Sequence, residues 1–317
     1  MSDTAIGIDV PKDHRGCPCP AGGHGAAGAR HGPRGIAQLL RWIGAEPVAR
    51  IRCGPTNRYH RALEARLAAA GLPLAPVNPL KARRFAQALG LQAKTDKIDA
   101  RMLAEMGQRL TPGLQVPNPK NLQHLKDLVA ARRALVADRV ADGNRTGGHS
   151  LALLRRLARR RRASIEADIA RIEAAIAALI AADPALTDKA RILQSLPGIA
   201  ALTAATLLAE APELGQIEAR QIAALAGLAP VTRESGTWRG KATIEGGRRP
   251  LRRALTMPTL TAIRRNRDLA ALFTRLRAAG KPAKLALVAA MRKLLILANT
   301  LLRENREWQE TRPVQTA

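Results

Sequence analysis

Two aspartates, Asp96 and Asp99, stand three residues apart in the stretch AKTDKIDARMLAE, in a neighbourhood rich in lysine and arginine. If the residues after Asp96 are helical, both carboxylates lie on one face of that helix. Oxygen ligands of this kind suit Mg²⁺ or Mn²⁺, and such an ion neutralises phosphate charge. Asp9 ends TAIGIDV, an apolar run that predicts a core strand, and would complete a metal cluster. The alternative left open is a helix-capping Asp96 with a solvent-facing Asp99.

A second candidate is Ser235, which is followed by glycine in VTRESGTWRGKATIEGGRRPLRR. A serine on such a loop could bind a phosphate or attack one. Nearby basic side chains would stabilise the charge that builds up on the phosphate. These are Arg233, Arg239, Lys241, Arg248, Arg249, Arg252 and Arg253. The competing interpretation is an ordinary turn serine.

The charge of the chain predicts a nucleic-acid partner. The formal net charge is +27 and the isoelectric point is about 11.6, an excess that a polyanion would offset. The stretch LRRLARRRRAS supplies a candidate phosphate-contacting helix face, with Arg155, Arg156, Arg159 and Arg160. A GC-rich gene encoding a basic surface, and a merely solvated helix face, are the alternatives.

A Pro-Gly turn begins LPGIAALTAATLLAE at Leu196 and precedes an Ala/Leu-rich helix. The pattern is typical of half a helix-hairpin-helix, in which amides near Gly198 would meet a DNA phosphate without reading sequence. The second glycine that is usual in this motif is Ala200 here. A plain helix–turn–helix packing unit is the alternative.

Several classes of protein are disfavoured. Three cysteines in a chain of 317 residues do not predict a disulfide framework, and the CPC pair alone is a weak zinc signal. The start lacks the features of a signal peptide, and no uncharged apolar run reaches about 18 residues. The expected location is therefore cytoplasmic, without a membrane partner.

The order of elements predicts three parts. Residues 1–110 alternate strands and helices, which indicates an α/β domain with a partly parallel sheet. Residues 111–189 are a linker and helices, with a two-heptad coiled-coil seam at Ile165, Ile169, Ile172, Ile176 and Leu179. Residues 190–317 are mainly helical, with a glycine-punctuated, strand-like interruption at about 230–247.

Taken in order, the motifs resemble those of insertion-sequence transposases or recombinases with an N-terminal RuvC-like (RNase H-like) DEDD domain and a C-terminal serine-bearing transposase domain. The motifs that support this resemblance are GIDVPK, TDKIDA, LPGI, SGTWRG with GGRRPLR, and RAAGKPAKLALVAAMRKLLILAN. The resemblance covers nearly the whole chain. Members of this family are guided by a structured bridge RNA and assemble as dimers or tetramers on nucleic acid.

The resemblance implies roles for single residues. Asp9 matches the first acid of the DEDD set, and Asp96 and Asp99 match the third and fourth, which would hold Mg²⁺ or Mn²⁺. Ser235 matches the nucleophile that joins covalently to a DNA end. The middle and C-terminal helices would hold RNA and DNA, and the basic residues of the last motif include Lys284, Arg292 and Lys293.

The chain also departs from the family pattern. The second acid normally begins an E-A-T-G-x-Y motif, and the aligned stretch GPTNRY has Gly54 there, with Glu46 and Glu64 at unsuitable positions. The stretch Gly16–Pro33 lacks the expected strand alternation, which compensating frameshifts would explain. Pro258 would kink an expected helix at a cost of roughly 3 kcal/mol. GNRTGGHS breaks the middle helices.

The predicted function is DNA transposition by metal-assisted phosphoryl transfer, in a copy whose activity Gly54 impairs. Two other classes stay open. One is a metal-dependent junction endonuclease that uses water in place of the serine. The other is a catalytically dead nucleic-acid-binding protein.

Overall fold

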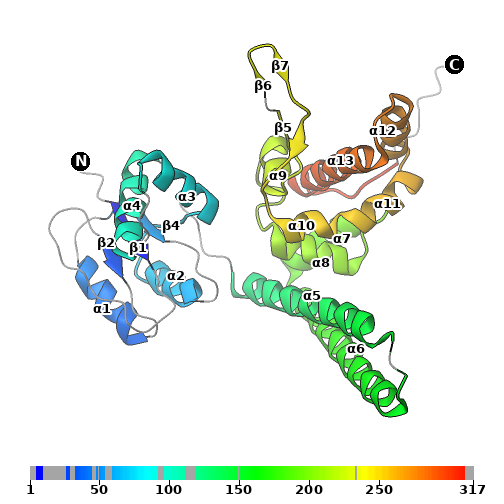
Figure 1. The fold of residues 1–317 in the computed structure, drawn as a ribbon, viewed down its shortest axis with the longest axis horizontal. Helices are drawn as coiled ribbons and strands as arrows, with labels where there is room; N and C mark the ends of the chain where they lie inside the picture. Colours follow the sequence, from blue (N-terminus) through cyan, green and yellow to red (C-terminus); the bar gives the residue numbers. More distant parts are fainter. Residues whose placement is uncertain are drawn as a thin grey trace. The chain divides into compact units, whose positions relative to one another are not determined.

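The computed structural model describes two compact units, residues 1–117 and 118–317 (Figure 1). Each unit is considered by itself. The residues described are 5–9, 26–28, 33–44, 48, 50–53, 59–91, 96–110, 119–148, 150–232 and 234–310. Most of the predicted linker, residues 111–118, lies outside this part of the chain. The middle helices share an apolar core with the helices that follow them. The division of the chain into three domains stays a prediction.

The first unit contains a four-stranded sheet in the order β2-β1-β3-β4, and every pair in it is parallel. Its strands are β1 (Ala5–Asp9), β2 (Ala26–Gly28), β3 (Arg50–Cys53) and β4 (Leu74–Pro76). The predicted α/β character of this unit is therefore confirmed.

Strand β2 corrects one expectation. The stretch Gly16–Pro33 was expected to lack strand pairing, yet Ala26–Gly28 pairs with β1, and does so in parallel. Small residues suffice here because β1 supplies a free edge with unpaired backbone groups. Residues 16–25 and 29–32 lie outside the described part of the chain.

Helices cover both faces of this sheet. Helices α1 (Pro33–Ile43) and α2 (Tyr59–Ala69) share a core with alternate strand residues such as Ile6, Ile8 and Ile51. Helices α3 (Pro79–Ala88) and α4 (Asp96–Arg109) pack together, and α4 contacts β1, β2 and β3. The alternation of each strand thus assigns Ile6 and Ile8 to the α1/α2 face, and Gly7 between them to the α4 face.

The contact between α4 and β1 is unusually close at Gly7. A Cβ atom built on Gly7 would lie 2.0 Å from the Ala100 carbonyl oxygen and 2.4 Å from the Ala104 nitrogen. Only a residue without a side chain allows this approach. On the next strand, Arg52 donates to the carbonyl oxygens of Met106 at 3.3 Å and Leu110 at 3.0 Å. Together these contacts fix where α4 crosses the sheet.

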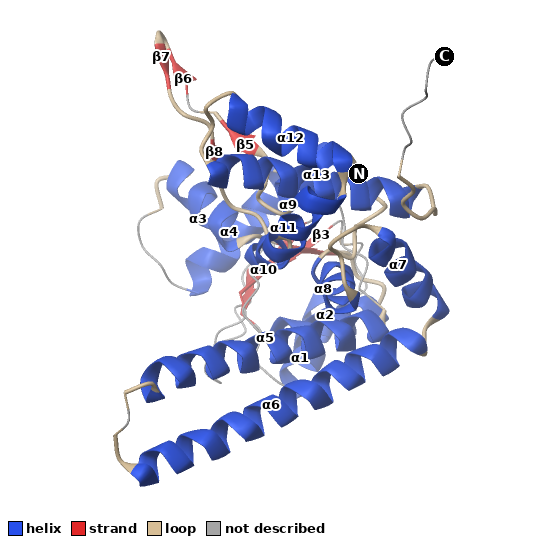
Figure 2. Cartoon of the chain, turned by 90° about the vertical axis from the view of Figure 1, so that its right-hand side faces the viewer, coloured by secondary structure: helices blue, strands red, loops and turns tan. Residues whose placement is uncertain are grey.

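The second unit begins with a long helical hairpin. Helices α5 (Lys120–Thr146) and α6 (Ala152–Ala181) lie side by side (Figure 2). Within the predicted seam, Ile169 and Ile176 are buried, so the seam serves packing within one chain. The predicted break at GNRTGGHS is later than expected, because α5 continues through Thr146 and includes the first four residues of that stretch.

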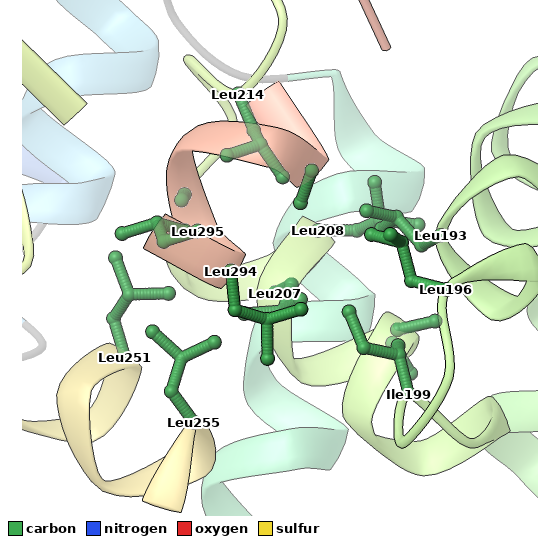
Figure 3. Close-up of a cluster of buried hydrophobic side chains, with 14 of the residues drawn as sticks. Leu193, Leu196, Ile199, Leu207, Leu208, Leu214, Leu251, Leu255, Leu294 and Leu295 are labelled. Atoms are coloured by element: carbon green, nitrogen blue, oxygen red, sulfur yellow. The ribbon is translucent and has the colours of Figure 1, made fainter. Parts of the chain in front are cut away.

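Seven further helices and two short antiparallel strand pairs complete the described part of the second unit, and the helices pack around one apolar core (Figure 3). This core contains leucines from several helices, among them Leu193, Leu207, Leu251 and Leu294. The helices are α7 (Pro184–Ser195), α8 (Ala201–Glu210), α9 (Ala219–Leu225), α10 (Arg249–Ala254), α11 (Thr256–Arg265), α12 (Arg267–Ala278) and α13 (Ala283–Arg303). The strand pairs are β5 (Pro230–Val231) with β8 (Thr243–Ile244), and β6 (Glu234–Ser235) with β7 (Trp238–Arg239).

The expected kink at Pro258 in the interior of a helix is not found. Helix α10 ends at Ala254 and α11 begins at Thr256, so Pro258 stands in the first turn of α11. An uninterrupted helix would need the Pro258 nitrogen to donate to Ala254, which proline cannot do. The chain divides the helix at that point, and proline is tolerated in a first turn.

Helix α13 is long and apolar enough to cross a membrane by length and composition. Ala290, Leu294, Ala298 and Leu301 are nevertheless buried against the other helices of the unit. Asn299 lies among them, accepts from the Gly215 amide at 2.8 Å and donates to the Ile217 carbonyl at 2.8 Å. These contacts are those of a core helix.

The close approach at Gly7 yields a stability prediction. Replacing Gly7 with Ala should lower the free energy of unfolding of the first unit by about 3 kcal/mol, because α4 must move away from β1. Urea denaturation followed by circular dichroism measures this. Gly148→Ala is the matched control, since its Cβ would meet nothing within 4 Å. Equal stability of the two variants would contradict the packing described for α4.

Candidate functional site

The acidic candidates of the first unit come from elements that touch. Asp9 is the last residue of β1, and Asp96 and Asp99 lie in the first turn of α4, the helix that packs on β1. Position 9 follows Gly7 by two residues, so the pleat of β1 assigns it to the α4 face. Asp99 is half-buried and directly precedes Ala100, the residue that approaches Gly7. The backbone therefore gathers these positions on one face of the sheet.

The structure describes only part of this acidic group. The side chains of Asp9 and Asp96 lie outside the described residues, as do Gly54 and Glu46. Among the side chains that are described, no three His, Cys, Asp or Glu residues gather as metal ligands would.

The opposite face of the sheet carries Cys53 and Glu64. Cys53 ends β3 within the core formed with α1 and α2. Burial raises the pKa of the Cys53 thiol to about 12, and the charge of nearby Glu64 adds to this. The thiol is therefore protonated and unreactive at neutral pH. Because Glu64 acts on the α1/α2 face, it is poorly placed to replace an acid on the α4 face.

Ser235 lies on a small hairpin of the second unit, at the top of Figure 1. Glu234 pairs with Arg239 and Ser235 pairs with Trp238, which leaves Gly236 and Thr237 as the turn. Gly236 has φ +56°, a value suited to the first turn position of a two-residue hairpin. Ser235, Arg239 and Lys241 are all exposed, so the serine hydroxyl and two predicted cationic ligands are accessible.

The base of this segment is anchored by two arginines that had been predicted to bind nucleic acid. Arg248 forms a bidentate ion pair with Glu213, at 2.7 and 2.6 Å, and donates to the Glu210 carbonyl at 2.7 Å. Arg252 donates to the carbonyl oxygens of Ala226 at 3.0 Å and Gly246 at 2.8 Å. Both guanidinium groups thus already have protein partners, which gives them a structural role.

The partner of Arg248 has a shifted pKa. Burial alone would raise the pKa of Glu213, but the hydrogen bond and positive charge of Arg248 outweigh burial and lower it. The ionised carboxylate is therefore stabilised in the folded protein. This identifies Glu213 as a structural residue that sequence reasoning missed, because an acid 35 positions before its partner gives no local signal.

Gly198 is also used for packing. It has φ +96°, and a Cβ atom there would lie 2.3 Å from the Pro258 carbonyl oxygen. The turn between α7 and α8 therefore packs directly on α11. This close contact supports the packing interpretation of LPGI, and the predicted phosphate contact near Gly198 remains a prediction.

The arginines of α6 divide into two groups. Arg155 and Arg159 line a cavity of about 570 Å³ near the end of the α5–α6 hairpin, together with Gly143 and Arg162. Arg156 and Arg160 are exposed and do not line it. Arg162 belongs to the basic stretch singled out in the sequence but not to the four arginines chosen from it, although its spacing of three residues from Arg159 places it on the same helix face.

A buried acid organises the same hairpin end. Asp142 is 1% exposed and accepts from Arg161 at 2.9 Å, which joins α5 to α6. Arg161 is thereby committed to a protein partner. The cavity arginines Arg155, Arg159 and Arg162 lie beside it and form a concave, strongly basic surface.

The basic residues of α13 have different surroundings. Lys284 is exposed near the start of the helix. Arg292 and Lys293 line a mainly apolar cavity of about 430 Å³, which is bounded by Pro230 of β5 and Leu272 of α12. The Arg292 Nε is buried without a hydrogen-bond partner among the described residues. These residues lie close to the base of the Ser235 segment, which begins at β5.

The Arg248–Glu213 pair predicts a pH-dependent stability. Arg248→Gln should destabilise the protein by about 1.5–3 kcal/mol near neutral pH, because it leaves a half-buried carboxylate without its partner. A lowered pKa means that Glu213 stabilises the fold above its ordinary value of 4.5 and that this contribution disappears as the pH falls through the folded value. Urea titrations at about pH 7 and about pH 3.5 should therefore show a difference that shrinks in acid.

Arg253→Gln is the charge-matched control, because Arg253 is an exposed neighbour on α10. It should leave the unfolding free energy within about 0.5 kcal/mol of the natural protein. If Arg248→Gln lowered the unfolding free energy by the same amount at both pH values, the hydrogen bond to the Glu210 carbonyl, and not the ion pair, would supply the stability.

Comparison with known proteins agrees with the earlier resemblance over most of the chain. Residues 6–153 match the DEDD-type IS110 transposase family, and residues 190–274 match the family described as "Transposase IS116/IS110/IS902 family". The pilin gene-inverting proteins of Moraxella bovis and Moraxella lacunata are each 28% identical over 98% of this chain and 99% of their own length. An uncharacterised 43.6 kDa protein of insertion element IS110 from Streptomyces coelicolor is 31% identical over 45% of this chain and 35% of its own. The chain belongs to the insertion-sequence transposases and recombinases of the IS110 type.

Proposed function

We propose that this protein performs DNA strand exchange with Ser235 as nucleophile and a RuvC-like acidic group as metal site. The observation that carries the proposal is the placement of Ser235 on an exposed hairpin whose base is anchored to the helical core by Arg248 and Arg252. The similarity to pilin gene-inverting proteins is consistent with recombination between DNA segments.

The proposed step at Ser235 is phosphoryl transfer. The Ser235 Oγ attacks a backbone phosphorus, an Oγ–P bond forms, and the P–O bond to the leaving strand breaks. The serine proton ends on the leaving oxygen, which becomes a hydroxyl. Arg239 and Lys241 are exposed near the serine and would stabilise the negative charge that develops on the phosphate.

The metal would be held by Asp9, Asp96 and Asp99. When bound, Mg²⁺ or Mn²⁺ would neutralise charge on the scissile phosphate. The gathering of these positions where α4 packs on β1 supports this assignment. Glycine at position 54 supplies one carboxylate fewer than the family pattern, so metal affinity and exchange are expected to be reduced in this copy.

Nucleic acid is the expected partner of the basic surfaces. DNA would lie along the Ser235 hairpin, and a structured guide RNA would occupy further basic surface, including the α5–α6 hairpin. The assembly would be a dimer or tetramer on nucleic acid, acting in the cytoplasm.

A second candidate is a nucleic-acid-binding protein without strand-exchange activity. The observation that favours it is Gly54, since the chain keeps its basic surfaces while one metal ligand is lost. Such a protein would bind nucleic acid with a steep salt dependence, and added Mg²⁺ would change nothing.

The α6 arginines yield a prediction about binding. Arg155→Gln with Arg159→Gln removes two charges from the cavity, whereas Arg156→Gln with Arg160→Gln removes two from the adjacent exposed face. On duplex DNA or an RNA hairpin, the cavity pair should reduce the slope of log affinity against log salt by about 1.8, or about 0.9 per lost phosphate contact on duplex DNA. The control pair should have a smaller effect. Equal effects would favour the solvated-face interpretation of this helix.

The proposed chemistry is tested with three proteins: the natural chain, Gly54→Glu and Ser235→Ala. Each is given a cognate donor–target DNA pair, guide RNA and Mg²⁺, and denaturing gels measure exchange and covalent protein–DNA adducts. Gly54→Glu should raise exchange by at least about tenfold, since even supporting residues around a metal change activity by that much. Ser235→Ala should form no adduct.

The outcomes separate the candidate functions. Cutting by Ser235→Ala without an adduct would favour the water-using endonuclease. Equal exchange by the natural chain and Gly54→Glu would show that position 54 is not the second metal ligand. Inactivity of both, alongside an active relative, would leave the binding protein as the function.

A further inference from the structure

An exposed tryptophan lies directly across the hairpin from Ser235. Trp238 is 60% exposed, and it is the cross-strand partner of the serine in the antiparallel pair β6–β7. Directly opposed residues in such a pair project to the same face, with Cβ atoms about 4.5–5.5 Å apart. The serine hydroxyl and the indole are therefore presented together on one face of the hairpin.

The exposure of Trp238 calls for an explanation. Tryptophan carries a large apolar area and is usually well buried. The other two tryptophans of the chain are less exposed: Trp42 is 38% exposed, and Trp308 is half-buried and packs against the core of the second unit. Neither packing of the core nor the β6–β7 backbone pairing uses the Trp238 ring, so its place in the hairpin points to a ligand.

The surroundings of the ring indicate which ligand. Arg239 and Lys241 follow Trp238 on the same short segment and are exposed. Arg239 pairs with Glu234 and so projects to the other face of the hairpin, from which its long side chain adds positive charge close to the ring. A flat aromatic surface next to cations is the arrangement with which proteins bind unpaired nucleotides, because bases stack on the ring while the cations meet the backbone. A purely apolar partner would leave these charges without a counterpart.

We infer that Trp238 stacks on an unpaired DNA base next to the phosphate held at Ser235. The ring would thereby position the strand end for the serine, so Trp238 is a positioning residue and not a catalytic one. Because Ser235 and Trp238 are direct cross-strand partners on one face, a base attached to a phosphate at the serine would lie next to the indole. The position of the stacked base next to Ser235 rests on the proposed function. The binding of a base by Trp238 can be tested separately.

The first test uses the intrinsic fluorescence of the full-length protein. Addition of the single strand dT12 should quench tryptophan emission, and Trp238→Phe should abolish most of that quenching. Trp42→Phe is the matched control and should retain it. Inorganic polyphosphate, which has charge but no bases, should leave the emission nearly unchanged. Quenching that persists in Trp238→Phe would overturn the inference.

The second test compares substitutions by affinity for dT12. Trp238→Ala should weaken binding about five- to hundredfold, as expected for one lost base stack, whereas Trp238→Phe should remain within about threefold of the natural protein. Unchanged binding by Trp238→Ala would contradict stacking. A change in sedimentation with no change in affinity would mean that the ring contacts a second copy of the chain, which also overturns it.

Ser235→Ala separates the two proposals. It should keep the quenching of tryptophan emission by dT12, because it leaves the ring in place, while forming no covalent adduct. If Ser235→Ala still forms the adduct, the proposed nucleophile is wrong although the stacking site stands. If the adduct depends on Ser235 but Trp238→Ala forms it at the natural rate, Trp238 does not position the strand.

Discussion

The anchoring of one exposed segment by two arginines is the constraint on which the candidate active site depends. Strands β5 to β8 have few buried side chains of their own, so packing alone would leave this segment poorly held. Arg248 joins its end to Glu213, and Arg252 binds the carbonyl oxygens of Gly246 and Ala226. Charge-assisted hydrogen bonds of this type are stronger and more directional than neutral ones. They anchor the end of the segment that carries the hairpin, while the hairpin itself remains accessible.

The net charge of +27 is therefore not uniformly available to a partner. Arg132, Arg133 and Arg161 join elements of the second unit through Glu173, Glu210 and Asp142. The arginines that line the cavity on α6, and the cations near Ser235, are exposed or line a concavity without such ion pairs among the described contacts. The chain has about half as many acidic as basic residues, 25 against 52, and several of the acidic ones hold arginines in place. This division separates the cations that hold the fold from those that face solvent.

The sequence predicted those features that depend on local pattern. The apolar run in TAIGIDV predicted a core strand, and its residues Ala5–Asp9 form β1. The isoleucine spacing of α6 correctly marked its buried face. The sequence did not predict β2, because Ala-Ala-Gly has no alternation and its pairing depends on the edge of β1. Nor did the sequence show that Arg248 would form an ion pair within the protein while Arg239 would stay exposed, since both lie in the same basic stretch. Their difference arises from Glu213, a partner brought close only by the fold.

The positions proposed to carry chemistry bear little of the folding energy. In β3, the residues that join the core are Ile51 and Cys53, and Gly54 follows after them. In the hairpin, Ser235 and Trp238 are exposed and do not belong to the apolar core of the unit. The proposed loss of an acid at position 54 would therefore remove a metal ligand while β3 keeps its core contacts and its pairing with β1. A chain of this family can keep its fold and its basic surfaces after its chemistry has weakened, because different residues maintain the two.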